Sequence, residues 1–183
     1  KSPDPDINIS CTSKIFHTAI FCSDSVAIEL AEVLIHEFSH NLLNDIMESH
    51  VLIEKKNSLE EKYYSPWRPD PRHLHGILHA VYVFEKVAYY YSQVLANNIK
   101  KSDYKYRFSL IVTRLRIALN VLIKNGDYST LGKTFINDLK DKVEDHLKNK
   151  LYDNKISKSE INAHYIKWMT VNKDLKKNNY EIV

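Results

Sequence analysis

The pentapeptide HEFSH at residues 36–40 constrains the fold more than any other feature of this 183-residue chain. Its two histidines are four residues apart, and on an α-helix such residues lie on one face about 6 Å apart. Two neutral imidazoles at that separation reach one metal ion at about 2.0–2.1 Å. The motif therefore predicts a helix with His36 and His40 as metal ligands and Glu37 on the flank of that face.

The sequence around HEFSH supports this helix. Asp24 or Ser25 is a suitable N-cap, and acidic residues follow in the first turns. Residues 14–22 (KIFHTAIFC) are rich in β-branched and aromatic side chains and short enough for a strand. We expect a short strand or small sheet that leads into a metal-binding helix. The apolar stripe of this helix, expected to be buried, comprises Ala27, Leu30, Ala31, Leu34 and Phe38.

The composition favours a mainly α fold in one domain over residues 1–183. The chain is 44% hydrophobic but has only three Gly and five Pro, which suits long helices better than a turn-rich β fold. Helical periodicity predicts further helices over residues 74–95, 103–124 and 130–151, and a last one opening with a capping box at residues 157–160. Because the chain begins KSPDPD, without Met, we expect it to be a fragment that lacks its true N-terminal portion.

Charge and cysteine content exclude several classes of protein. Residues 1–91 carry 8 basic and 13 acidic side chains (net −5), and residues 92–183 carry 18 and 10 (net +8). We interpret the basic half as a solvated helical face, with an acidic partner as the alternative, because no nucleic-acid motif accompanies its lysines. Two cysteines are too few for a disulfide framework and favour the cytoplasm. No apolar run approaches the ~20 residues that span a bilayer.

A third metal ligand is needed, because HExxH supplies only two. The metzincin continuation is absent, since Leu43 and Ile46 stand where it requires Gly and His. We favour His79, which lies one turn into a helix that follows a stiff proline-rich loop, and we expect Glu85 to face solvent. The full set of candidates is Asp70, His73, His75, His79 and Glu85.

The proline-rich loop is residues 63–72 (YYSPWRPDPR), where three prolines enforce an extended or turning backbone with side chains splayed outward. Its Trp67 and Tyr64 are candidates to wall a peptide groove, although aromatic loop residues more often close a core. From the residues alone, Arg72 and Arg68 could equally form an exposed salt bridge on this loop.

Three segments resemble the HExxH-motif peptide-modification proteins, the α-ketoglutarate-dependent HExxH-type peptide β-hydroxylases. They are residues 28–47 (IELAEVLIHEFSHNLLNDIM), 63–84 (YYSPWRPDPRHLHGILHAVYVF) and 164–168 (HYIKW), and the resemblance extends from about Thr18 to Val171. HExxH followed by YSPWRxDPRxxxGxxH is far more specific than HExxH alone. The chain departs from the family at His73, where the family often has Pro.

The resemblance implies an enzyme that hydroxylates a side-chain β-carbon of a ribosomally made precursor peptide, using Fe(II), dioxygen and α-ketoglutarate. It implies His36, His40 and His79 as the metal ligands, with Arg68 and Arg72 at the family's two arginine positions. Because arginine pairs with carboxylates through two hydrogen bonds, Arg72, and next Arg68, are candidates to bind the distal carboxylate of α-ketoglutarate. A missing N-terminal segment or a partner chain could complete the site.

Two alternatives stay open. In a zinc peptidase, Glu37 would be the general base that takes a proton from zinc-bound water. In an iron hydroxylase, which needs no such base, Glu37 would orient a ligand or a bound water. A third interpretation is an inactive protein that binds a leader peptide and holds no metal.

Overall fold

The computed structural model describes residues 10–12, 20–22, 27–54, 62–97, 99 and 102–173. Within these residues the protein is mainly helical, which confirms the mainly α part of the predicted fold class. Among the described residues, no helix is both long enough and apolar enough to cross a membrane. The elements are β1 (Ser10–Thr12), β2 (Ile20–Cys22), α1 (Ala27–Ser49), α2 (Leu74–Ala96), α3 (Ser102–Asn125), α4 (Thr130–Lys148) and α5 (Asn154–Val171).

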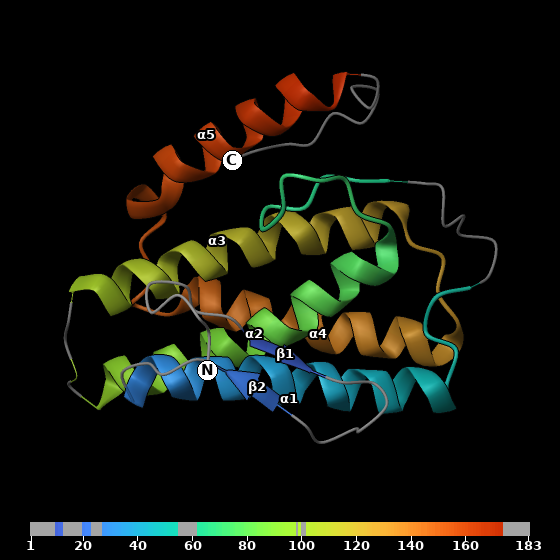
Figure 1. Cartoon of the computed structure of the whole chain (residues 1–183), viewed down its shortest axis with the longest axis horizontal. Coiled ribbons are helices and arrows are strands. Elements are labelled where there is room, and N and C mark those ends of the chain that lie inside the picture. The colour runs from blue at the N-terminus through green and yellow to red at the C-terminus, as the bar shows by residue number, and fades with distance from the viewer. Residues whose placement is uncertain are drawn as a thin grey trace.

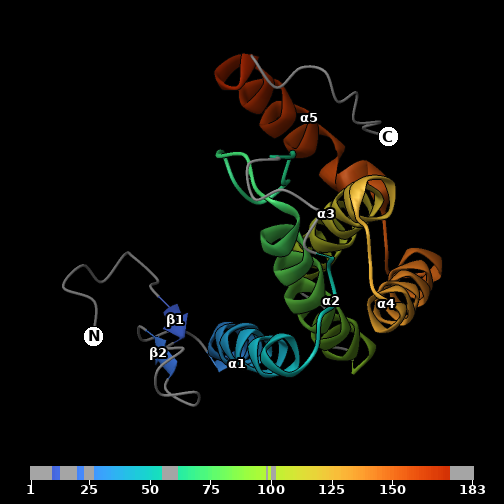
Figure 2. The same ribbon diagram turned by 90° about the vertical axis from the view of Figure 1, so that its right-hand side faces the viewer.

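Helix α2 is the centre of the molecule and packs against α1, α3 and α4. The antiparallel β1–β2 hairpin lies on the side of α1 away from α2, and α5 lies on the outer side of α3 (Figures 1 and 2). Strand β2 coincides with the last three residues of the strand predicted over residues 14–22. Residues 14–19 and the predicted caps Asp24 and Ser25 lie outside the described residues.

The core fills the space between these helices. Helix α3 is buried on nearly every face along its middle, as is the side of α2 that contacts it. A second, smaller cluster joins the proline-rich loop to α3 and α5 and contains Tyr64, Leu110, Ile117, Ile161 and Trp168.

The prediction that the apolar stripe of α1 with Leu34 and Phe38 is buried is wrong. Phe38 is 54% exposed, and Leu34 and Leu42 on the same face are also exposed. Helix α1 turns the face that carries His36, His40 and Leu43 toward α2 instead. A different set of α1 side chains, Ile28, Ile35, Ile46 and Met47, packs against the core.

The last helix starts earlier than predicted. The Asp153 side chain accepts a hydrogen bond from the Lys155 amide at 3.0 Å, so the helix is capped at Asp153 rather than at the predicted box. Ser157 is instead completely buried, and its hydroxyl lies 2.8 Å from that of Thr113.

Candidate functional site

Three imidazoles from two helices meet between α1 and α2. His36 and His40 come from successive turns of α1, and His79 comes from the second turn of α2. The Nε2 atoms of His36 and His40 are 3.2 Å apart, and the Nδ1 atoms of His40 and His79 are also 3.2 Å apart. The structure thus brings all three predicted metal ligands together.

The nitrogens of His36 and His40 are spaced for one ion, because two ligands at 2.0–2.1 Å from a metal are about 3 Å apart. His79 faces the other ring nitrogen of His40, so the three nitrogens do not converge on one point. Accordingly, the described residues contain no preformed group of three His, Cys, Asp or Glu side chains around a metal position. Convergence requires rotation of the His40 or His79 ring.

Burial sets the protonation of the two α1 histidines. The pKa of His40 is lowered to about 4, chiefly by desolvation and next by the neighbouring His36, while the Glu37 carboxylate opposes the shift. Desolvation also lowers the pKa of His36, with Glu32 opposing. Both imidazoles are therefore neutral at pH 7, which is the form that binds a metal. In donor chemistry and in the His36–His40 spacing, these residues fit a metal ion.

Glu37 lies in the interior, 5% exposed, next to the histidine pair on α1. Its negative charge acts on the His40 imidazole. This position is compatible both with a general base and with a group that orients a ligand.

Aromatic rings support His36 from the side of the loop. Phe84 on α2 contacts the His36 ring edge-on, with centroids 5.0 Å apart. Trp67 stacks flat on Phe84 at 4.7 Å and an interplanar angle of 4°. Trp67 is half-buried, and Phe84 lies between its ring and the His36 imidazole.

The proline-rich loop is closed at its base. Tyr63 and Arg72 pair through two backbone hydrogen bonds, in which the Tyr63 amide donates to Arg72 at 2.7 Å and the Arg72 amide donates to Tyr63 at 2.9 Å. The prediction that its side chains splay outward is wrong for the first half, because Tyr63, Tyr64, Ser65 and Pro66 are all buried.

Tyr64 is 0% exposed and packs against α5, where its hydroxyl lies 2.9 Å from Nδ1 of His164. The structure therefore places Tyr64 in the core and not on the wall of a groove. This contact also gives a role to the HYIKW segment, since His164 is its first residue.

The charged half of the loop gathers around Asp70. Arg68 and Arg72 both donate to this carboxylate, at 3.2 and 3.1 Å, and both guanidinium groups are partly exposed. The side chain of Arg72 also borders Gly76, where a Cβ atom would lie 3.5 Å from its Nε.

A cavity of about 320 Å³ opens beside the histidine cluster, between the end of α1 and the start of α2. His79 and Gly76 belong to its wall, so the cavity connects the imidazoles with the region of Arg72. The lining residues are Asn44, Met47, Glu48, His73, His75, Gly76 and His79.

The other candidates for the third ligand have different partners. His73 caps α2, because its Nδ1 accepts a hydrogen bond from the Gly76 amide at 3.2 Å. His75 lines the same cavity as His79. The prediction that Glu85 faces solvent is wrong: it is 4% exposed and paired with Lys86 and with His146 of α4, because it lies on the face of α2 that packs against α4.

One polar group near the site was not predicted from the sequence. Glu32 lies one turn before His36 on α1, and it accepts hydrogen bonds from Arg107 and, at 2.5 Å, from Tyr91. This group ties α1 to α2 and α3. In the sequence, only the four-residue spacing of Glu32, His36 and His40 indicates that Glu32 lies near the site, because its partners Tyr91 and Arg107 are distant along the chain.

Comparison with known proteins adds no relative. No protein-family model matches the chain, and no curated protein matches it.

Proposed function

We propose that this protein is an Fe(II)- and α-ketoglutarate-dependent oxygenase that hydroxylates a side-chain β-carbon of a ribosomally synthesised precursor peptide. The observation that carries the proposal is the meeting of His36, His40 and His79. Three imidazole ligands would leave positions free on a metal, as such oxygenases require. Fe(II) held there would supply the redox chemistry by which dioxygen and α-ketoglutarate become a peptide hydroxyl, succinate and CO₂.

The cosubstrate would enter the cavity beside His79. Arg72 borders this cavity at Gly76 and would pair with the distal carboxylate of α-ketoglutarate, with Arg68 next in line. The N-terminal end of α2 also favours a negative charge there. Trp67 is the loop side chain that we expect to contact the peptide. With two cysteines in the chain, we place the enzyme in the cytoplasm.

Anaerobic reconstitution tests the proposal. The protein is loaded with Fe(II) and α-ketoglutarate and exposed to dioxygen, with a candidate precursor peptide present. Succinate release and a peptide that gains one oxygen atom are expected only when iron and α-ketoglutarate are both present. If the zinc-loaded protein instead cleaves the peptide, with or without α-ketoglutarate, the oxygenase proposal is overturned.

The second candidate is a zinc peptidase, favoured by the burial of Glu37 beside His40. The substitution Glu37→Gln separates the two. A peptidase would keep its metal but lose ~10²–10⁴-fold in turnover, because the bound water loses its base. An oxygenase would still form succinate, with any loss traceable to misplaced ligands.

Arg72→Ala tests the cosubstrate assignment. Loss of a charge-assisted hydrogen bond worth about 1.5–3 kcal/mol should raise KM for α-ketoglutarate about tenfold or more and leave iron content unchanged. Arg68→Ala is the matched control, since Arg68 shares the Asp70 contact but is more exposed. A larger effect of Arg68→Ala would move the anchor to Arg68.

A further inference from the structure

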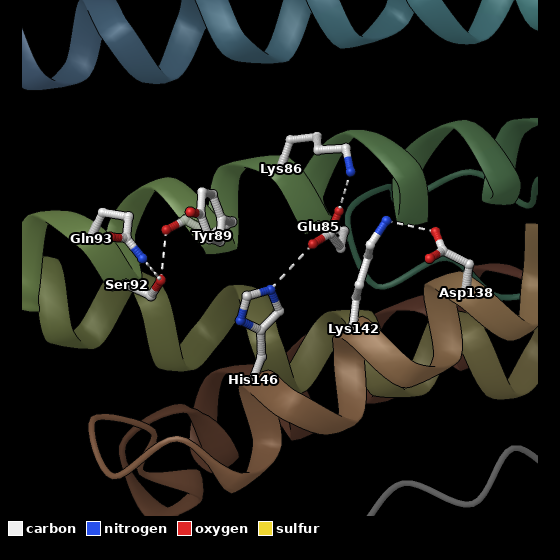
Figure 3. A network of polar contacts seen from close by, with 8 residues as sticks. All are labelled: Glu85, Lys86, Tyr89, Ser92, Gln93, Asp138, Lys142 and His146. Carbon is white, nitrogen blue, oxygen red and sulfur yellow. Dashed lines mark hydrogen bonds and ion pairs between the residues drawn. The ribbon is translucent and has the colours of Figure 1, made fainter.

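A second polar cavity, of about 570 Å³, lies between α2 and α4, away from the histidine cluster between α1 and α2. Its wall includes Glu85, Lys86 and Tyr89 of α2 and Lys142 and His146 of α4. Figure 3 shows Lys142 and His146 extending from α4 toward α2, where Glu85 faces His146. None of them takes part in the proposed oxygenase chemistry.

A buried acid–imidazole pair forms the floor of this cavity. One Glu85 oxygen accepts a hydrogen bond from Lys86 Nζ at 2.7 Å, and the other lies 3.4 Å from His146 Nε2. Burial alone would raise the pKa of Glu85, but hydrogen bonds from His146 and Lys86 lower it below its usual value. The carboxylate is thus ionised, with a partner at each oxygen.

Two ammonium groups converge on the same space from opposite helices. Lys86 Nζ lies 5.2 Å from the centroid of the Tyr82 ring, and Lys142 is close enough to act on the Tyr82 hydroxyl and on Glu85. Lys142 Nζ donates to Asp138 at 2.6 Å. An ammonium group has three N–H donors, so one contact apiece leaves both lysines able to bind a further anion.

The remaining lining shows what kind of anion fits. Tyr89 is 57% exposed, so an aromatic ring stands open to solvent at this cavity. Asp145 is the other carboxylate of the lining, and it is exposed, where water and salt weaken its repulsion of an anion. A ligand with a carboxylate and an apolar body would satisfy both the lysines and the ring.

We propose that this cavity binds a small organic carboxylate, held between the ammonium groups of Lys86 and Lys142, with its apolar body against Tyr89. Glu85 acts as a positioning residue, because its carboxylate pairs with Lys86, and His146 faces the other oxygen of that carboxylate. The site is independent of the metal site and of the proposed oxygenase function.

Calorimetric titration of the full chain with benzoate, acetate, inorganic phosphate and methylammonium tests this proposal. Benzoate should bind saturably and more tightly than acetate or phosphate. Lys142→Gln and Lys86→Gln should each weaken benzoate binding about tenfold. Tyr89→Ala should reduce benzoate affinity to that of acetate, because only benzoate contacts the ring.

Lys140→Gln is the matched control, since Lys140 also lies on α4 and is exposed, but it pairs with Glu144 and does not line the cavity. The Lys140→Gln variant should bind benzoate as tightly as the parent protein does. The proposal is overturned if benzoate does not bind saturably, if Lys140→Gln weakens binding as much as Lys142→Gln, or if methylammonium binds in its place. Equal affinity for phosphate would show a general anion site and overturn the carboxylate assignment.

Discussion

His40 occupies the middle of the imidazole cluster, with one ring nitrogen toward His36 and the other toward His79. Burial keeps the two α1 rings neutral, although the carboxylates of Glu32 and Glu37 oppose this. Neutral imidazoles 3.2 Å apart do not repel as two imidazolium ions would, so the cluster can exist before a metal arrives. Single substitutions test whether each of the three imidazoles binds the proposed metal.

Removal of any one of the three imidazoles should weaken metal binding about 100-fold or more. Loss of a hydrogen bond that only orients a metal ligand already costs ~10–100-fold in affinity, and loss of the ligand itself costs more. The variants are His36→Ala, His40→Ala and His79→Ala, and the measurement is metal affinity by competition with a chelator. His75→Ala, which lies in the same cavity wall, is the control and should keep its metal. If His75→Ala loses the metal and His79→Ala retains it, the third ligand is His75.

Acid should weaken the fold through Glu85. The pKa of its carboxyl is lower in the folded protein than its usual value of 4.5, so the unfolded chain binds the proton more readily. Its contribution to stability is present above about pH 4.5 and is lost as the pH falls through the folded pKa. In urea unfolding, the stability difference between the parent protein and Glu85→Gln should shrink as the pH falls from about 6 to 3. A difference that does not change with pH would assign the effect to packing alone.

At the scale of elements, α4 is attached to the segment after α1 by its N-terminal turn. The Ser129 side chain caps α4 by accepting from the Gly132 amide at 3.0 Å, and the Ser129 amide donates to the Leu52 carbonyl at 3.2 Å. A Cβ atom at Gly132 would lie 2.0 Å from that carbonyl oxygen. Glycine at this position therefore permits the close approach of two backbones.

Gly132→Ala should destabilise the protein by about 1–3 kcal/mol, because backbone must move to admit the methyl group. The matched control is Gly76→Ala, where the nearest atom would be 3.5 Å away, an ordinary contact. Gly76→Ala should be neutral or slightly stabilising, since alanine has the higher helix propensity. The urea midpoint of each variant measures the difference, and equal midpoints would contradict the assignment at Gly132.

At the scale of the whole molecule, the bundle has a main core around α2 and α3 and a separate small cluster beneath α5. This small cluster also holds the first half of the proline-rich loop, through Tyr64 and its contact with His164. The C-terminal helix therefore supports the loop that carries Arg68 and Arg72, although it lies far from the histidines.

Trp168→Ala should release α5, at a cost of about 3–5 kcal/mol, because the indole is 1% exposed in this cluster. Ile166→Ala on the same helix is the control, since that side chain is mostly exposed. Hydrogen exchange should show faster exchange of α5 amides in Trp168→Ala and an unchanged α2. Loss of protection throughout α2 as well would show that the two clusters unfold as one.

The helices could be predicted from the sequence because their signals are local. The observed bounds of α2, α3 and α4 differ from those predicted by at most three residues, since apolar spacing and end signals such as Asn125-Gly126 are local to each segment. The i, i+4 spacing of His36 and His40 likewise needs only a helix to place both imidazoles on one face.

Only the tertiary structure decided which helix faces are buried and which side chains meet. Leu34 and Phe38 look like a core stripe until the imidazole face of α1 packs on α2, and Glu85 looks exposed until His146 lies against it. Tyr64 likewise becomes a core residue only when α5, 100 residues later, covers it. Burial and long-range pairing depend on the arrangement of all helices together, and no local spacing in a chain contains that arrangement.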